Sequence, residues 1–278
     1  MFLSRNSKLI KSIVIVFLYF SVVQSAVYGK EHTLNYRLNK EYFRYYLNDF
    51  KDIVVSPGHW QRSDLLEFSA ILGSSLLLFT VDENINSWVL KHQNSGASNL
   101  SRAFSILGSG YFLGSALAGL YLSGEIGKDN NIRKIALISL ESWLLTGAIV
   151  SSAKFILGRA RPYKDEGSLS FHPFSLKSGF YSFPSGHAAS AFAVATVVAQ
   201  QSQRFYIDFL AYSLATLASL SRVYGNKHWA SDVFLGGVAG YVVAQKILGL
   251  HKQRQEKKLR VYFEFSSQQQ SIIFCFDF

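Results

Sequence analysis

From residue 63 onward the sequence consists mainly of apolar stretches of helical length, and this pattern limits the possible folds more than any other feature. We expect six apolar helices, at roughly 64–81, 98–122, 130–158, 185–202, 205–223 and 229–250. Glycine and serine are frequent inside these stretches, and small residues let helix backbones approach closely, both in bilayers and in soluble bundles. The pattern therefore predicts an all-α, six-helix bundle.

The first residues have the order of a signal for export. Arg5, Lys8 and Lys11 precede a short apolar run, SIVIVFLYFSVV, and the small residues Ser25 and Ala26 follow it. Because this run is shorter than the ~20 residues that span a bilayer, we expect a signal peptide over residues 1–26. An uncleaved N-terminal anchor is the alternative.

The segment 27–62 differs from the bundle that follows it. Leu38, Phe43, Leu47 and Phe50 recur at roughly helical spacing among polar residues. Such spacing predicts an amphipathic helix that packs on a core or lies at a membrane surface.

The bundle is expected to form one domain over residues 63–250, followed by a tail of different character over 251–278. The tail begins with a basic linker, and apolar residues then alternate with other residues over 261–265 and again over 272–278. Alternation on both sides of a polar turn predicts a short C-terminal β-hairpin. We find no internal repeat and no second independent domain.

The chain is basic, with 28 Lys and Arg against 18 Asp and Glu and a net charge of +10. Nucleic acid, anionic lipid and phosphorylated substrates are the partners that such a charge favours. Cys275 is the only cysteine, so neither an intramolecular disulfide nor a multi-cysteine metal site can form.

Three polar clusters interrupt the apolar pattern, and the first is KFILGRARP over 154–162. It places Lys154, Arg159 and Arg161 at the end of the third apolar stretch, where Pro162 ends the helix. Cations that favour a helix C-terminus, or that extend from it to a membrane surface, are the structural alternative.

The second cluster is PSGH, at the start of the fourth apolar helix. A helix N-terminus presents free N–H groups that bind anions. Ser185 adds a hydroxyl, Gly186 permits close approach to the backbone, and His187 can donate a proton. An ordinary N-cap with a surface histidine is the alternative.

The third cluster is SRVYGNKHWASD over 221–232. His228 and Asp232 are four residues apart and share a helix face. The carboxylate can hold one imidazole nitrogen and leave the other as a nucleophile, within reach of Arg222. A surface His–Asp pair of little consequence is the alternative.

Taken together, the clusters predict a site for phosphoryl transfer at one end of the bundle. Their spacing, K-x6-RP, then PSGH, then SR-x5-H-x3-D, resembles the type 2 phosphatidic acid phosphatase (PAP2) superfamily over roughly residues 64–250. This superfamily includes lipid phosphatases, bacterial acid phosphatases and vanadium haloperoxidases.

The resemblance implies a role for each matching residue. His228 would be the nucleophile that forms a phosphohistidine, Asp232 would orient it, and His187 would be the general acid. The residues implied to bind the phosphate are Lys154, Arg161, Ser185, Gly186 and Arg222. No metal or other cofactor is expected, and vanadate is expected to inhibit. A zinc site formed by His187, His228 and Asp232 is the alternative.

The expected activity is hydrolysis of a lipid phosphate or diphosphate, such as phosphatidic acid, a polyprenyl diphosphate or a lipid of the lipid A type. The aromatic loop 163–183 favours an apolar substrate. A non-specific periplasmic acid phosphatase and a vanadate-dependent haloperoxidase are the alternatives, and haloperoxidases are typically longer chains. A basic binding module would not need the His228–Asp232 pair, so we expect no nucleic-acid partner.

The expected location is outside the cytoplasm, periplasmic or membrane-associated. If the helices span, the basic junctions opposite the clusters, among them Lys128 and Arg204, place the site on the outer side. An exported N-terminus, however, would put the start of the first helix outside as well. For this reason the sequence favours an exported helical domain associated with a membrane surface or bilayer.

Overall fold

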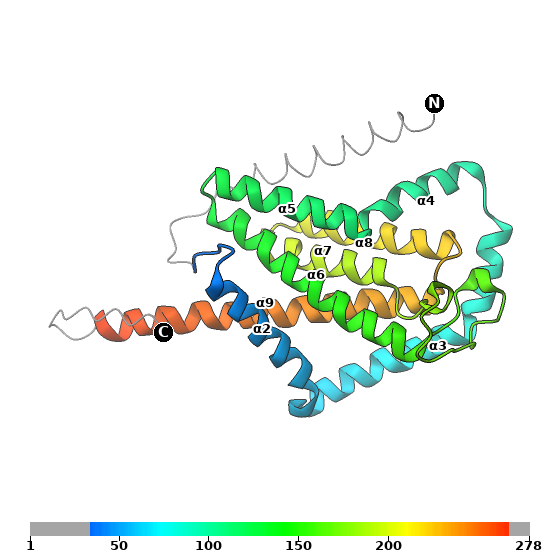
Figure 1. Ribbon diagram of the computed structural model, residues 1–278, viewed down its shortest axis with the longest axis horizontal. Coiled ribbons are helices and arrows are strands. Elements are labelled where there is room, and N and C mark those ends of the chain that lie inside the picture. The colour runs from blue at the N-terminus through cyan, green and yellow to red at the C-terminus, as the bar shows by residue number, and fades with distance from the viewer. Residues whose placement is uncertain (1–33, 267–278) are drawn as a thin grey trace.

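The structure is a computed structural model that describes residues 34–266, with side chains described through residue 256. The expected signal peptide over 1–26 lies outside the described residues. Within this range the chain forms an elongated helical bundle (Figure 1) of eight α-helices: α2 (Lys40–Val55), α3 (Arg62–Lys91), α4 (Ser95–Leu107), α5 (Gly110–Ile126), α6 (Asn130–Leu157), α7 (Gly186–Ser202), α8 (Phe205–Tyr224) and α9 (Ala230–Ser266). Three short 3-10 helices accompany them: η1 (Ser56–His59), η2 (Pro162–Lys164) and η3 (Ser178–Phe180).

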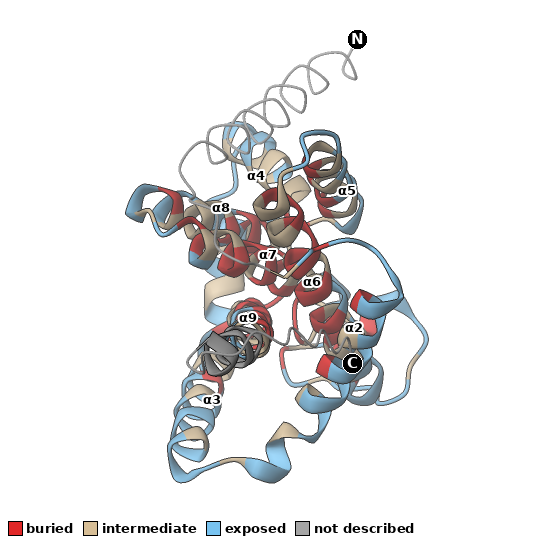
Figure 2. Ribbon diagram, turned by 90° about the vertical axis from the view of Figure 1, so that its left-hand side faces the viewer, coloured by how far each residue is buried: buried red, intermediate tan, exposed pale blue. Residues whose placement is uncertain are grey.

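Helix α7 lies at the centre of the bundle, with α6, α8 and α9 packed around it (Figure 2). Its sequence is rich in alanine, and Ala188, Ala189 and Ala193 are buried. Where α9 crosses α7 the backbones touch, since a Cβ on Gly240 would lie 2.1 Å from the Ala189 carbonyl oxygen. Small residues on both helices therefore set how closely α9 approaches α7.

The largest apolar cluster joins α6, α7 and α9. Leu137, Ile138 and Leu145 of α6 are buried against Val197 of α7 and Ile247 of α9. Burial of such side chains contributes about 1.5–3 kcal/mol each, so this cluster fixes the three helices that carry most of the polar motifs.

The expected six-helix count is wrong. The single helix expected over 98–122 is two helices, α4 and α5, bent by 50°. The break falls at Gly108, where a Cβ would lie 2.8 Å from the His187 carbonyl oxygen, and Ser109 follows as the N-cap of α5. The amphipathic helix expected within 27–62 is α2, which brings the count of described α-helices to eight.

The expected C-terminal β-hairpin is also unsupported. Helix α9 continues through Ser266, so the proposed first strand over 261–265 is helical, while the second, over 272–278, lies outside the described residues. Between 251 and 260 the sequence HKQRQEKKLR has no glycine or proline and is rich in helix formers, so nothing stops the helix before the alternating residues begin.

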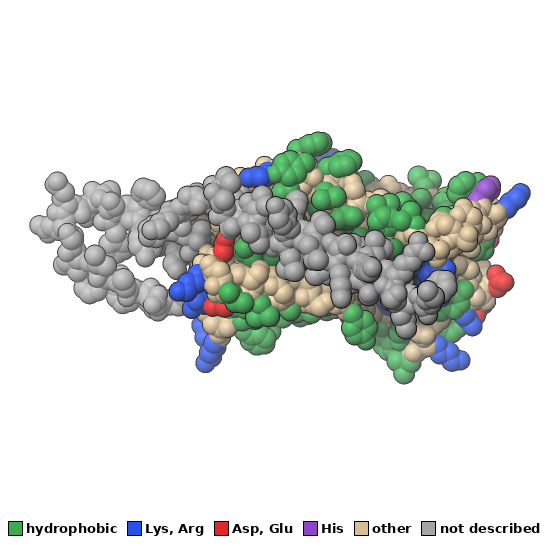
Figure 3. Space-filling view, turned by 90° about the horizontal axis from the view of Figure 1, so that it is seen from above, with side chains coloured by type: hydrophobic (Ala, Val, Ile, Leu, Met, Phe, Trp, Pro, Cys, Tyr) green, Lys and Arg blue, Asp and Glu red, His purple; other side chains and the backbone are tan. Residues whose placement is uncertain are grey.

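Several helices have the length and composition of membrane spans. These are α3, α6 and residues Ala230–Glu256 of α9, and the bent pair of α4 and α5 would add a fourth span. Only 6% of the most apolar window of α3 is buried in the protein, which leaves its apolar side chains facing outward. Further apolar side chains lie along the face seen in Figure 3. These helices suggest a membrane protein, which agrees with the membrane association expected from the sequence.

Candidate active site

The first motif lies where α6 ends and the long loop begins. Gly158 caps α6 in a left-handed conformation, with φ of 61°, and a Cβ there would lie 1.7 Å from the His172 carbonyl oxygen. The chain can fold back across the end of α6 only with glycine at this position. Lys154 in the last turn donates from Nζ to the carbonyl oxygens of Tyr181, at 2.7 Å, and Ser182, at 3.3 Å.

The second motif forms the N-terminus of α7, as predicted. Ser185 is the fully buried N-cap, and its backbone N–H donates to the Asp232 carbonyl oxygen at 2.8 Å. A Cβ on Gly186 would lie 3.7 Å from Cε of Lys154, so the Lys154 side chain lies beside the start of this helix. The first two motifs thus meet.

The third motif places His228 just before α9, with only 2% of its surface exposed. Its Nδ1 lies 2.7 Å from the Ser182 carbonyl oxygen and 3.6 Å from Oδ2 of Asp232. A carbonyl oxygen only accepts hydrogen bonds, so Nδ1 carries the proton and, in the neutral ring, Nε2 keeps its lone pair. The tautomer is therefore fixed mainly by a backbone carbonyl, with Asp232 close behind it.

Asp232 is fully buried and has several partners besides His228. Its Oδ2 accepts from the Ser182 hydroxyl at 2.5 Å and from the Trp229 backbone N–H at 2.9 Å. Its Oδ1 accepts from Nη1 of Arg159 at 2.6 Å. These contacts hold both the carboxylate and the Ser182 segment to which His228 is bonded.

The remaining predicted residues converge on the same place. Arg222 donates from Nη1 to the Ser105 hydroxyl at 2.6 Å, while the Nε atoms of Arg222 and Arg161 are buried without a hydrogen-bond partner. Burial and nearby positive charges, above all Arg222, together lower the pKa of His187 to about 3. The other groups that lower it are His228, Lys154 and Arg161.

His228 is also held neutral. Burial lowers its pKa to about 4, against the opposing effect of its contact with Asp232. Both imidazoles are thus neutral near pH 7, and fixed arginine side chains supply the positive charge of the site. Such a site attracts an anion, and a bound anion would raise both pKa values.

The alternative zinc site fits this geometry poorly. Both oxygens of Asp232 accept hydrogen bonds, and Nδ1 of His228 faces a carbonyl oxygen. Among the residues that the structure describes, the group of acidic and histidine side chains close enough to hold a metal lies elsewhere, at Asp49, Glu141 and His251.

All eight predicted residues lie at this end of the bundle, and residues 135–256, which contain every one of them, match the family model of the PAP2 superfamily. This region of the chain belongs to the PAP2 superfamily. The match begins later than the predicted resemblance, which started near residue 64.

Curated relatives of the PAP2 region include two proteins named lipid A 1-phosphatase. The one from Porphyromonas gingivalis is 28% identical over 182 residues, which is 63% of this chain and 36% of that protein. The one from Rhizobium johnstonii is 37% identical over 95 residues, covering 34% of this chain and 38% of the relative. The chain thus spans less than two fifths of the length of either relative.

A solved structure shares the fold. The crystal structure of Aquifex aeolicus LpxE is similar with a TM-score of 0.50 and 22% identity, over 61% of this chain and 95% of that one. At this identity the likeness concerns the helical architecture.

The sequence analysis missed Asp82, and it named Arg159 without assigning it a role in the site. Arg159 is fully buried and donates to Asp232, to the Ser231 hydroxyl at 2.7 Å and, from Nη2, to Asp82 Oδ2 at 2.8 Å. Asp82, also fully buried, comes from α3, outside the matched residues, and its Oδ1 accepts from the Ser231 N–H at 2.9 Å.

A signal for Asp82 was present in the sequence. It follows directly on the apolar stretch 64–81 that predicted the first helix, whereas α3 continues for ten more residues and ends at Lys91. A carboxylate at that position is compatible with a helix when a buried cation faces it, and Arg159 is that cation.

Proposed function

We propose that this protein is a metal-independent phosphatase that hydrolyses a lipid phosphate or diphosphate through a phosphohistidine at His228. The observation that carries the proposal is the buried imidazole of His228, whose Nδ1 is bonded to the Ser182 carbonyl oxygen, so that Nε2 is the free nitrogen. A neutral imidazole of fixed tautomer beside several cations is suited to attack on phosphorus.

In the proposed reaction Nε2 of His228 attacks phosphorus and the bond from phosphorus to the lipid oxygen breaks. His187 gives a proton to the departing oxygen. Water then attacks the phosphohistidine, the P–N bond breaks, and inorganic phosphate leaves. Because the pKa of His187 is about 3 without an anion, His187 must gain its proton as the negatively charged substrate binds.

The phosphate would be held by Lys154, Arg161 and Arg222 together with the N-terminus of α7 at Ser185 and Gly186. The buried, unpartnered Nε atoms of the two arginines support this role, since an anion would supply their acceptors. Vanadate, which mimics five-coordinate phosphorus, should inhibit.

Two features support a lipid as the substrate. The loop between α6 and α7 exposes Leu169, Phe174 and Leu176, which are 71%, 63% and 82% exposed, beside the proposed site. The curated relatives include lipid A 1-phosphatases and an Arabidopsis thaliana protein named probable lipid phosphate phosphatase 4. Lipid A is therefore the first substrate to test, followed by phosphatidic acid and a polyprenyl diphosphate.

We further propose that the site faces away from the cytoplasm. Basic side chains gather at the other end of the bundle, at Lys128 between α5 and α6, at Arg133 in the first turn of α6, at Arg204 before α8 and at Lys252 in α9. Cytoplasmic ends of membrane helices are enriched in Lys and Arg.

The test is phosphate release by the purified full chain in detergent, with lipid A, phosphatidic acid and glycerol phosphate compared by kcat/KM. We expect the lipids to be preferred, activity to persist in EDTA, and His228→Ala to abolish both turnover and acid-labile phosphate labelling. His92→Ala, which changes an exposed histidine at the end of α3, is the control and should remain active.

Three results would contradict the proposal. Turnover by His228→Ala above a few per cent of the wild-type rate would exclude the phosphohistidine. Bromide oxidation with vanadate and without phosphatase activity would instead indicate a haloperoxidase. Equal efficiency on glycerol phosphate would indicate a non-specific acid phosphatase.

A further inference from the structure

A second polar cluster, far from the proposed active site, joins three helices inside the bundle. Asp49 of α2, Glu141 of α6 and His251 of α9 are 0%, 1% and 2% exposed. Glu141 precedes Lys154 by about 20 Å of helix, at 1.5 Å per residue. Ionisable side chains at such depth within apolar helices are costly and generally serve a function.

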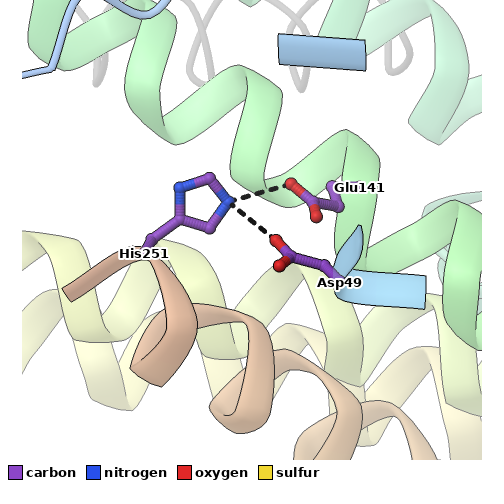
Figure 4. Close-up of side chains that lie close together, drawn as sticks. All are labelled: Asp49, Glu141 and His251. Atoms are coloured by element: carbon purple, nitrogen blue, oxygen red, sulfur yellow. Dashed lines mark hydrogen bonds and ion pairs between the residues drawn. The ribbon is translucent and has the colours of Figure 1, made fainter. Parts of the chain in front are cut away.

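The three side chains point toward one another (Figure 4). Nε2 of His251 lies 2.9 Å from Oε2 of Glu141 and 3.7 Å from Oδ2 of Asp49. One ligand atom from each residue lies within 4.8 Å of the other two, so a single ion could contact all three.

The charges around His251 call for a further positive charge. Two buried carboxylates face its Nε2, and Arg254, which donates to both oxygens of Asp49, balances only one of them. Oε1 of Glu141 is buried and has no hydrogen-bond partner among the described residues. Buried charges are stable when they are paired or bind a metal, and a metal ion at this place would supply the missing positive charge.

The surroundings have the form of a metal site. The Tyr36 hydroxyl lies 3.2 Å from Nδ1 of His251, and the Tyr42 hydroxyl donates to Oε2 of Glu141 at 2.9 Å. Histidine ligands of metals usually bond their second ring nitrogen in this way, which orients the ring. The free Oε1 of Glu141 offers a fourth ligand atom.

We propose that Asp49, Glu141 and His251 bind a divalent transition-metal ion, of the zinc, manganese or iron(II) class, that fastens α2 to α6 and α9. One imidazole with carboxylate oxygens suits these ions, whereas Mg²⁺ and Ca²⁺ prefer oxygen ligands alone. The ion is structural and independent of the phosphatase chemistry, which is expected to need no metal. A second proton on His251 is the rival explanation.

The test is the metal content of the purified full chain, with any affinity tag removed. After incubation with Zn²⁺, Mn²⁺ or Fe²⁺ under nitrogen and removal of unbound ions, elemental analysis should find about one ion per chain of at least one metal. His251→Gln removes a ligand and should lower that content at least tenfold, since even the loss of an outer partner lowers metal affinity 10–100-fold. His59→Ala, which changes an exposed histidine in η1, is the matched control and should keep the ion.

A gentler variant keeps the test valid if His251→Gln does not fold. Tyr36→Phe leaves all three ligands and should weaken affinity for the ion about tenfold. Cobalt(II) added to the metal-free wild type should give visible absorption bands of a nitrogen- and oxygen-bound ion, and His251→Gln should not. Wild-type protein that retains none of these metals, or a folded His251→Gln that retains as much as wild type, would overturn the proposal and indicate a protonated ion-pair network.

Discussion

At the residue scale, neighbouring groups set the chemistry of His187 and His228. Burial, together with the positive side chains that would bind phosphate, keeps His187 neutral until an anion arrives, since both lower its pKa. Substrate charge and proton delivery are thereby linked: a bound dianion offsets the arginines and permits the imidazolium that the reaction needs.

This linkage predicts how anion binding depends on pH. An anion raises the pKa of His187, so the complex binds more protons than the free protein and anion affinity should increase as pH falls from 8 to 5. Sulfate is the suitable probe because its own charge is constant over this range. Calorimetry should show the increase for wild type and a smaller one for His187→Gln. Identical pH dependence in the two proteins would contradict the proposed proton donor.

A second residue-scale prediction concerns Arg159, which bridges Asp82 and Asp232. Lysine keeps the charge but lacks the planar fork that contacts two carboxylates at once. Arg159→Lys should therefore leave one buried carboxylate poorly paired, at a cost of up to about 3–5 kcal/mol in unfolding free energy. We expect a lower Tm in detergent together with a lower kcat, as Asp232 shifts. Arg102→Lys, on the exposed side of α4, makes the same change without a buried partner and should alter neither.

At the element scale, the approach of α9 to α7 positions the site, because His228 and Asp232 lie at the start of α9 and His187 at the start of α7. Gly236 and Gly240 are the residues of α9 at this crossing, and a Cβ on Gly236 would lie 2.4 Å from the Ser185 carbonyl oxygen. The spacing of the proposed catalytic groups therefore depends on positions that carry no chemistry of their own.

Two glycines of the same helix provide a test of this dependence. Gly240→Ala adds a methyl group where no space exists and should lower both Tm and kcat. Gly249→Ala lies where no atom comes within 4 Å of the added group, and should raise helix stability by up to about 1 kcal/mol without affecting turnover. Equal effects of the two substitutions on thermal unfolding and phosphate release would show that contact between the backbones is not limiting.

At the scale of the whole molecule, the bundle has two chemically different ends. The proposed active site with its exposed apolar loop lies at one end, and most of the basic junctions lie at the other. Between them, outward-facing apolar helices such as α3 have the composition of lipid-exposed surface. Under the proposed function, this arrangement would let a lipid remain in the bilayer while its phosphate enters the site.

The orientation of the whole molecule can be tested with single cysteines. In a Cys275→Ser background, Gly225→Cys lies at the exposed end of α8 beside the site, and Gly127→Cys lies at the exposed end of α5 on the other side. A membrane-impermeant maleimide should label Gly225→Cys in intact cells and Gly127→Cys only after permeabilisation. The reverse pattern would place the site in the cytoplasm.

The sequence by itself determined the helical class and the composition of the proposed site. Both depend on local information: apolar periodicity indicates helices, and motifs of fixed spacing such as His228-x3-Asp232 place side chains on one face of a single turn. The eight residues taken from the motifs all lie at one end of the bundle, as expected. The split of one expected helix at Gly108 could not be read locally, because it depends on contact with His187, nearly 80 residues away.

Only the tertiary structure decided which buried charges pair. Asp82 of α3 and Asp232 of α9 meet Arg159 from the loop that follows α6. Asp49, Glu141 and His251 come from α2, α6 and a distant part of α9. A carboxylate within an apolar helix looks like an interruption until its partner is known, and that partner is chosen by packing over long sequence separations. For the same reason, neither the partners of Asp82 nor the meeting of Glu141 with His251 could be predicted from the sequence.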